Sequence, residues 1–226
     1  MTACGSCVAI QTHRKRLQQT PHWIIDVRRN DGGSDATYGP IVEALIGNPI
    51  LLGSAEFLAT LANIEGHSRI CGLYAPDDAG CRKAIQPLVE ALGAAPAGTY
   101  VRPPGSSSPV MRLDPDQPER ARPQRVAVLT DAGCASSCGQ FLLAMRQGWN
   151  VKLMGRRTDG ALDYSNLRPF TLPSGERMLW YATSRSARLP HLPVDCATCV
   201  IPRARATSPR AAATIPGSPS SIARRM

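Results

Sequence analysis

The chain has 226 residues, of which 43% are hydrophobic, and it carries a formal net charge of +9. That length allows one sizeable core with a small accessory segment, and the hydrophobic content excludes a fully disordered chain. No run approaches the roughly 18 apolar residues that a membrane span needs, and the first residues lack a basic segment followed by an apolar one. We therefore expect a soluble, cytoplasmic chain with no membrane span and no visible export signal.

Part of the positive charge is concentrated at the C-terminal end of the chain. Residues 202–226 contain five arginines and no acid, and they are rich in Ala, Ser and Pro. Because this composition buries too little apolar surface to order itself, we expect residues 204–226 to form a disordered basic tail. The net charge therefore does not indicate a basic folded core, and nucleic acid is not an expected partner.

The first strong structural signal is an apolar run at residues 23–27, Trp-Ile-Ile-Asp-Val. It predicts a buried strand, and the turn-forming sequence Arg-Arg-Asn-Asp-Gly-Gly-Ser follows it. Residues 38–45 have helical spacing, with Pro40 tolerable only in a first turn. The order here is strand, glycine loop, helix.

The next hundred residues are less regular. Residues 51–52 indicate a short strand, residues 55–64 a helix of good helix formers, and residues 79–94 an amphipathic helix that Pro87 should kink or delay. Between positions 95 and 124 lie seven of the 20 prolines, so we expect a surface insertion there.

Regular patterning returns in the last third of the chain. Residues 125–130 predict a second buried strand, residues 139–147 a helix, and residues 151–154 a third strand. Two more strands are expected at 167–172 and 178–183, separated by a Pro-Ser-Gly turn. Strands that alternate with helices indicate parallel pairing and an α/β core.

Two loops could carry chemistry, because each follows a predicted strand and precedes a predicted helix. One contains Gly32 and Gly33, and the other contains Ser136. Such loops lie at the carboxyl ends of strands, where helix N-termini and free backbone N–H groups face ligands. A serine before a helix is often only an N-cap, so this unit alone leaves both interpretations open.

The eight cysteines allow a further hypothesis. Cys4 and Cys7 near one end, and Cys196 and Cys199 near the other, have the spacing of two zinc knuckles, which would make the protein a zinc-stapled binding domain. The alternative is that scattered cysteines serve as small hydrophobic residues. Without an export signal, disulfides are not expected.

Three segments together resemble one known family. Residues 23–34 are similar to the Asp-Arg-Asn-Gly loop of tail-specific (C-terminal-processing) serine proteases, which are related to the tricorn core protease. Residues 128–141 resemble the nucleophile segment of that family, and residues 154–160 resemble its Gly-Thr-Gly turn. Residues 195–202 loosely resemble the segment that closes the domain.

This resemblance implies a fold and a domain organisation. The fold would be α/β, a ClpP/crotonase-like parallel sheet with flanking helices, incomplete at the N-terminus. Residues 1–20 would be an N-terminal helical remnant, and residues 21–203 the catalytic domain with residues 95–124 as its Pro-rich surface insertion. Family members are usually exported, so we expect a truncated gene product, with an altered reading frame in its tail as a further hypothesis.

The resemblance also assigns roles to individual residues. Ser136 would be the nucleophile, and the backbone N–H groups of Ser137 and of Gly33 or Gly32 would form the oxyanion hole. Asp195 falls close to the glutamate of the tricorn-type arrangement, in which a serine and that glutamate orient a histidine. Two further residues, Asp26 and Arg28, would brace the glycine loop.

The general base is the part of the family pattern that this sequence lacks. Serine–lysine members place a lysine just after the glycine turn, where this chain has Ala161, and Lys152 falls within a predicted strand. None of the four histidines matches the tricorn-type base: His13, His22, His67 and His191. Gly139 also replaces the acidic residue that commonly follows the nucleophile.

Two functions follow from the resemblance. The first is a serine-type peptidase that hydrolyses unfolded or C-terminal polypeptide segments, without metal or cofactor. The alternative is a catalytically impaired remnant that binds peptides or partners, because a serine without a base is a weak nucleophile. The sequence gives no indication of oligomeric state.

Overall fold

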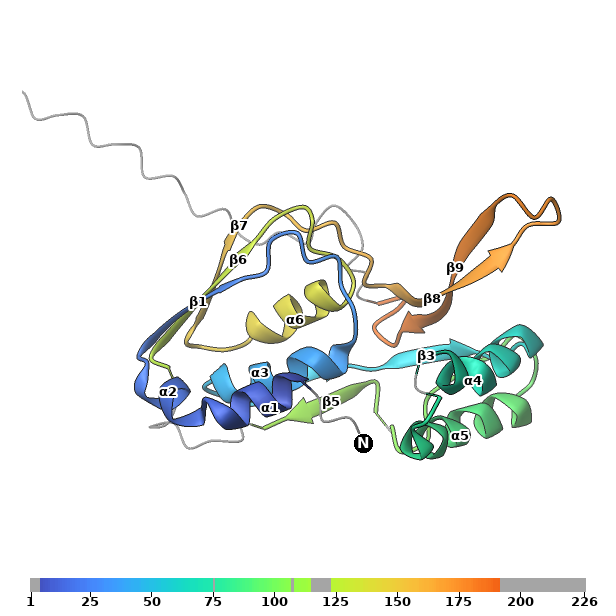
Figure 1. Ribbon diagram of the computed structural model, residues 1–226, viewed down its shortest axis with the longest axis horizontal. Coiled ribbons are helices and arrows are strands. Elements are labelled where there is room, and N and C mark those ends of the chain that lie inside the picture. The colour runs from blue at the N-terminus through green and yellow to red at the C-terminus, as the bar shows by residue number, and fades with distance from the viewer. Residues whose placement is uncertain (1–4, 75, 107, 115–122, 192–226) are drawn as a thin grey trace, which may run out of the picture.

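The computed structural model describes residues 5–74, 76–106, 108–114 and 123–191 (Figure 1). The expected basic tail at 204–226 lies outside these residues. Among the helices described, none combines the length and the apolar character that crossing a membrane requires.

A three-stranded parallel sheet combines one strand from the start of the chain with two from its second half. Its strands are β1 (His22–Asp26), β6 (Arg125–Thr130) and β7 (Val151–Gly155), in the order β1-β6-β7. Trp23 pairs with Val126, which in turn pairs with Val151, so the three strands run in register and end at one edge. The prediction of a parallel sheet with flanking helices is confirmed.

Helices cover one face of this sheet (Figure 1). The helix α3 (Asp35–Leu45) follows β1, and α6 (Ser137–Met145) follows β6. Two short helices, α1 (Gly5–Thr12) and α2 (Arg14–Gln19), precede β1, and α1 packs against α3. The buried core between sheet and helices consists of Val42, Leu45, Ile46, Ile50, Val126, Val128, Cys134, Cys138, Phe141, Leu142, Ala144 and Met145.

The opposite face of the sheet is open. Along β1, exposed residues alternate with half-buried ones, and Ile24 is 72% exposed. In β6, Val126 and Val128 are buried toward the helices, while the residues between them are only partly covered. The strand prediction for residues 23–27 is confirmed, but its burial on both sides is wrong: this strand has one covered face.

A second, smaller core lies beside the first (Figure 1). It is built from β3 (Ala55–Leu58), α4 (Leu61–Tyr74) and α5 (Ala79–Ala94), and its buried residues are Phe57, Ala59, Leu88 and Leu92. The predicted helix at 55–64 is therefore wrong, because residues 55–58 form a strand and helix begins only at Leu61.

Pairing with neighbouring strands explains why good helix formers adopt a strand here. β3 lies between β4 (Tyr100–Val101) and β9 (Met178–Ser186). The carboxylate of Glu56 forms ion pairs with Arg102 at 3.1 Å and with Arg185 at 3.0 Å, one from each side. Such cross-strand pairs override the weak helical preference of individual residues.

The proline-rich insertion contains two strands that the sequence did not indicate. Besides β4, it holds β5 (Val110–Leu113), which pairs with β2 (Ile50–Gly53). Residues 108–112 are exposed, whereas Leu113 packs against the main core. The predicted strand at 51–52 is confirmed as the centre of β2.

The last two strands form a long antiparallel hairpin. β8 (Tyr164–Thr171) pairs with β9, and the hairpin projects away from the rest of the chain (Figure 1). Both predicted strands are confirmed, and both are longer than expected. Large apolar side chains on the hairpin, such as Trp180 at 57%, are exposed.

Both helical prolines lie inside their helices, so the placement of Pro40 in a first turn is wrong, while the predicted helix at 79–94 is confirmed. α3 begins at Asp35, which puts Pro40 at its sixth residue instead of in its first turn. Pro87 lies in the middle of α5, which begins at Ala79 without delay. Packing of Leu88 and Leu92 into the second core stabilises α5 on both sides of the proline.

Two disulfides contradict the expectation of free cysteines. One joins Cys71 of α4 to Cys81 of α5, with 5.8 Å between their Cα atoms, and the other joins Cys134 to Cys138, with 5.5 Å. Each cysteine is brought to its partner by a turn or helix contact that spacing alone does not reveal. The proposed zinc ligands Cys4, Cys196 and Cys199, and the side chain of Cys7, lie outside the described part.

Candidate active site

The loop after β1 is braced by an ion pair at its start. The Arg28 guanidinium donates to both carboxylate oxygens of Asp26, with a shortest distance of 2.6 Å. These side-chain hydrogen bonds, followed by one from the backbone N–H of Arg28, lower the pKa of Asp26 to about 2. Asp26 therefore stays ionised. Its ion pair with Arg28 fixes the backbone where the loop leaves β1 toward Gly32 and Gly33.

A second carboxylate ties this loop to the loop after β6. Asp131 accepts hydrogen bonds from the backbone N–H groups of Arg29 and Gly133, both at 2.9 Å. The bond from Arg29 is the main cause of the lowered pKa of Asp131. The backbone N–H of Ala135 also donates to the carbonyl of Asn30 at 3.2 Å, so the two loops form one connected unit.

Ser136 occupies a sharp turn between β6 and α6. Its backbone dihedrals are φ 53° and ψ −122°, a region that non-glycine residues rarely adopt. The buried disulfide between Cys134 and Cys138 brackets this turn, and the Ser136 N–H donates to the Gly160 carbonyl at 3.0 Å. Within the described residues, the Ser136 hydroxyl takes part in no hydrogen bond.

The glycine loop lies directly against this serine. A Cβ atom on Gly32 would lie 2.9 Å from the Ser136 Cβ and 3.3 Å from its Oγ, so a side chain larger than hydrogen does not fit. Gly32 and Gly33 both have positive φ angles, 122° and 141°. The Ser137 hydroxyl donates to the Gly33 carbonyl at 2.9 Å, which fixes the loop to the first turn of α6. The structure thus brings together Gly32, Gly33, Ser136 and Ser137.

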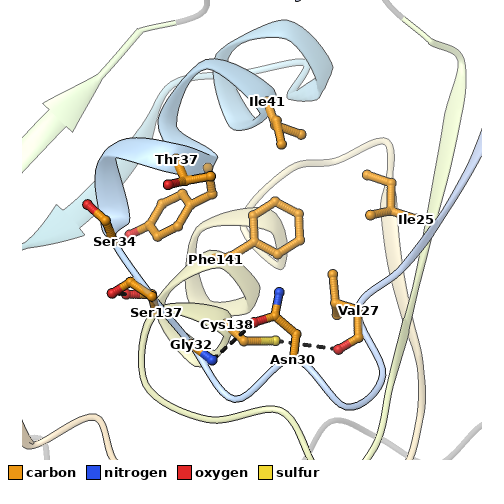
Figure 2. A pocket seen from close by; sticks show the side chains of 12 residues that line it. Ile25, Val27, Asn30, Gly32, Ser34, Thr37, Ile41, Ser137, Cys138 and Phe141 are labelled. Atoms are coloured by element: carbon orange, nitrogen blue, oxygen red, sulfur yellow. Dashed lines mark hydrogen bonds between the residues drawn. The ribbon is translucent and has the colours of Figure 1, made fainter. Parts of the chain in front are cut away.

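The backbone amides of these residues differ in their availability. The Gly32 N–H donates to the Asn30 Oδ1 at 3.0 Å (Figure 2). By contrast, in the part of the chain that the structure describes, the N–H groups of Gly33 and Ser137 donate no hydrogen bond. Ser137 is the first residue of α6, where N–H groups point away from the helix and carry partial positive charge. Gly33 and Ser137 are therefore the amides that can bind an anionic oxygen.

An apolar cavity of about 180 Å³ opens beside these amides (Figure 2). The side chains of Ile25, Ile41 and Phe141 lie around it, and Gly33 and Ser137 form part of its rim. The complete lining is Ile25, Val27, Asn30, Gly32, Gly33, Ser34, Thr37, Tyr38, Ile41, Ser137, Cys138 and Phe141. The sequence did not predict this cavity. Its walls nevertheless come from two predicted helices, because Tyr38 and Ile41 lie on α3 and Phe141 lies on the inward face of α6.

The position expected for a base lies close to Ser136 but carries no base. Ala161 is exposed, with φ 57°, and directly follows Gly160, whose carbonyl accepts the Ser136 N–H. Lys152 pairs in register with Ala127, near the start of the edge strand β7 and away from the loops at the carboxyl ends of the strands. His67 lies in the second core against the Phe57 ring, where burial lowers its pKa.

The described residues include every lysine and histidine of the chain, and none of them hydrogen-bonds to Ser136. Asp195 lies outside the described residues. Gly139, where the family commonly has an acid, is required by packing: a Cβ there would lie 2.7 Å from the Leu162 side chain.

Comparison with protein families gives one match. The model of peptidase family S41 matches residues 8–187, which include the glycine loop, the serine turn and the turn at Gly160. No curated protein sequence matches the chain.

Among solved structures, mature CPAF is similar in fold, with 14% identity and a TM-score of 0.53 over 79% of this chain. The photosystem II D1 C-terminal processing protease matches with 14% identity and a TM-score of 0.43, covering 80% of this chain and 34% of that one. A putative peptidase from Parabacteroides merdae matches with 21% identity and a TM-score of 0.40, covering 74% of this chain and 39% of that one. This chain spans 38% of the length of the CPAF chain.

Proposed function

Because the chain belongs to peptidase family S41, we propose that it carries a serine-peptidase site in which Ser136 is the nucleophile. The observation that carries this proposal is the contact between Gly32 and Ser136 at a turn that holds the serine at φ 53°. A strained strand-to-helix turn exposes the hydroxyl above the sheet, as in nucleophile elbows of other hydrolases. A merely capping serine would instead accept a hydrogen bond from the helix, and the Ser136 side chain makes no such cap.

The oxyanion formed during attack would be bound by the N–H groups of Gly33 and Ser137. Both are unoccupied amides at the rim of the cavity, whereas the amide of Gly32 is engaged by Asn30. The N-terminus of α6 adds a favourable field for the negative charge. Losing one such donor typically raises the barrier by about 2.7–4 kcal/mol.

The reaction would be an acyl transfer to Ser136. The Ser136 Oγ attacks the carbonyl carbon of a peptide bond, the C–N bond breaks, and the hydroxyl proton leaves with the amine. Water then cleaves the resulting ester, which yields the carboxylic acid product and restores the serine. The apolar cavity between Ile25, Ile41 and Phe141 would hold the side chain of the residue that donates the acyl group.

A second candidate function rests on Ala161. A serine hydroxyl near neutral pH is almost entirely protonated, and no lysine or histidine of the chain hydrogen-bonds to Ser136. The glycine loop and the serine turn can therefore bind a polypeptide without cleaving it. In that case a fluorescent peptide derived from unfolded casein binds the protein, and neither the wild type nor Ser136→Ala releases fragments over many hours.

Labelling with a fluorophosphonate tests the nucleophile directly. We expect adduct formation on the peptide that contains Ser136, located by mass spectrometry, and background labelling in Ser136→Ala. The control is Ser174→Ala, in the turn of the distant hairpin, which should label as the wild type does. Equal labelling of Ser136→Ala and wild type would remove Ser136 from the mechanism.

A further inference from the structure

A second hollow lies along a neighbouring face of α6 from the apolar cavity. Its volume is about 310 Å³, and Tyr38 lines both hollows. Residues of α6 at helical spacing, Gln140, Leu143 and Ala144, form one wall. The exposed apolar side chains of Leu51 and Val110 lie at the opposite wall. We name this hollow the arginine groove, after the two arginines that line it.

These arginines, Arg146 and Arg188, lack the carboxylate partners that other arginines of the chain have. Arg28, Arg102 and Arg185 each form an ion pair. Among the described residues, neither arginine of the groove is paired with an acid.

One nitrogen of the Arg188 guanidinium has no hydrogen-bond partner in the described structure. Its Nη2 donates to the Leu162 carbonyl at 3.3 Å, but its Nε is buried and has no hydrogen-bond partner in the described structure. A buried donor without a partner is costly, so the Arg188 guanidinium is only partly satisfied by the protein itself. The guanidinium also contacts the backbone at Gly53, where an added Cβ would lie 3.2 Å from Nη1, so its position is confined.

One acid lines the groove, and it is already engaged. Burial, and then the neighbouring Asp35 carboxylate, raise the pKa of Tyr38. Tyr38 is therefore neutral at ordinary pH, and Asp35 lies against it. The remaining charged groups of the groove are the two arginines, so the groove is positively charged overall. Planar guanidinium groups favour carboxylates, which they can bind through two parallel hydrogen bonds.

The distance from the nucleophile sets where such a carboxylate would lie. Ser136 and Arg146 are the residues that flank α6, ten positions apart, which corresponds to about 15 Å along the helix. An extended peptide advances about 3.3 Å per residue, so it covers this distance in four to five residues. A polypeptide whose scissile carbonyl lies at Ser136 would thus reach Arg146 with a residue four or five positions further along.

We propose that the arginine groove is an anionic subsite, in which Arg146 and Arg188 bind a carboxylate four to five residues beyond the bond held at Ser136. The carboxylate is either an Asp or Glu side chain or the end of the substrate chain, since both present the same group. This inference rests on the proposed function, because it uses Ser136 as its origin.

Peptide binding to the Ser136→Ala variant tests the subsite without requiring cleavage. The probes are fluorescent peptides with one apolar residue and, five positions later, Glu or Gln in an otherwise equal amidated sequence. A third peptide places a free terminal carboxylate at that position. We expect the Glu peptide to bind roughly tenfold more tightly than the Gln peptide at low salt, as charge-assisted hydrogen bonds in a partly exposed groove allow. The third peptide shows whether a chain end serves equally.

Variants assign the effect to the groove. Arg146→Gln should remove the preference for Glu over Gln, and Arg188→Lys should reduce it, because lysine keeps the charge and loses the planar fork. Arg177→Gln, in the distant hairpin, removes the same charge and should keep the preference. Equal binding of the Glu and Gln peptides, or equal loss in Arg146→Gln and Arg177→Gln, would overturn the subsite.

The two proposals fail separately. If fluorophosphonate labels Ser136 but the Glu and Gln peptides bind equally, the anionic subsite is overturned and the role of Ser136 as nucleophile stands. A clear preference for the Glu peptide with no labelling of Ser136 supports the subsite and overturns the catalytic role of the serine.

Discussion

The loop after β6 and the loop after β7 emerge side by side at one edge of the parallel sheet, where Thr130 pairs with Gly155. The first supplies a strained serine, a free amide and a helix N-terminus. The second reaches back through the pairing of Ala135 with Gly160, but it has Ala161, a residue without a titratable side chain, at the position expected for the base. In the proposed mechanism, backbone geometry for binding a transition state and side-chain chemistry for moving a proton are separable, and the described residues supply the first without the second.

Adding a base to the second loop should produce the largest change. Ala161→Lys places an amine beside the residue whose carbonyl accepts the Ser136 N–H, and a positioned base typically accelerates such chemistry by about 10²–10⁴-fold. The measurement is the rate of fluorophosphonate labelling at pH 8. Ala161→Gln has similar length without a titratable amine and should label at the wild-type rate. Equal rates for the lysine and glutamine variants would mean that the turn does not aim its side chain at Ser136.

Crowding the serine turn from the glycine loop, which follows β1, should have the next largest effect. Gly32→Ala and Gly33→Ala both place a side chain at positive φ, but only the Cβ at position 32 would collide with Ser136, since nothing lies within 4 Å of a Cβ at position 33. We expect Gly32→Ala to lower the labelling rate by about 10²-fold, which is comparable to losing an oxyanion donor. Gly33→Ala should show a smaller loss, from backbone strain alone. A larger loss in Gly33→Ala would contradict the assigned contact.

The glycine loop after β1 and the serine turn after β6 could largely be predicted from the sequence, and the reason is chemical. The glycines at 32 and 33 and the serine pair at 136 and 137 are rare in such order, and each has a backbone role that few residues can fill. The strands at residues 23–27 and 125–130 were also predictable, because apolar β-branched runs leave few alternatives.

Features that depend on distant partners could not be predicted. Residues 55–58 form a strand because Glu56 lies between Arg102 and Arg185, which are far away in sequence. The pairing of Gln147 with both backbone groups of Leu51 also joins segments nearly 100 residues apart. Local propensity contains no information about such contacts.

Removing the disulfides should separate stability from site geometry. Cys134→Ala/Cys138→Ala and Cys71→Ala/Cys81→Ala each open a short loop, and each should lower the free energy of unfolding by about 2–3 kcal/mol. Only the first pair brackets Ser136, so only it should also slow labelling of the folded protein. Urea unfolding gives the stability, and labelling in the absence of urea gives the effect on the site. Slower labelling in the Cys71/Cys81 variant would show that the two cores are coupled.

The smallest expected effect concerns the brace at Asp26. Its pKa is lowered to about 2 by Arg28, so its contribution to stability is present above the unfolded pKa and is lost as pH falls through about 2. NMR titration of the Asp26 carboxyl group should give a midpoint near pH 2 in the wild type. In Arg28→Gln the midpoint should rise toward the ordinary value for aspartate. An unchanged midpoint would mean that the ion pair does not exist in solution.

The pH dependence of Ser136 labelling in the wild-type protein tests the separation of the two loops most directly. Without a general base, the rate should follow the small deprotonated fraction of the serine and rise about tenfold per pH unit from pH 6 to pH 9, with no plateau. A rate that levels off with an inflection near pH 7 would show that an imidazole or a shifted amine already activates the serine. That result would contradict the conclusion that Ser136 has no general base to accept its proton.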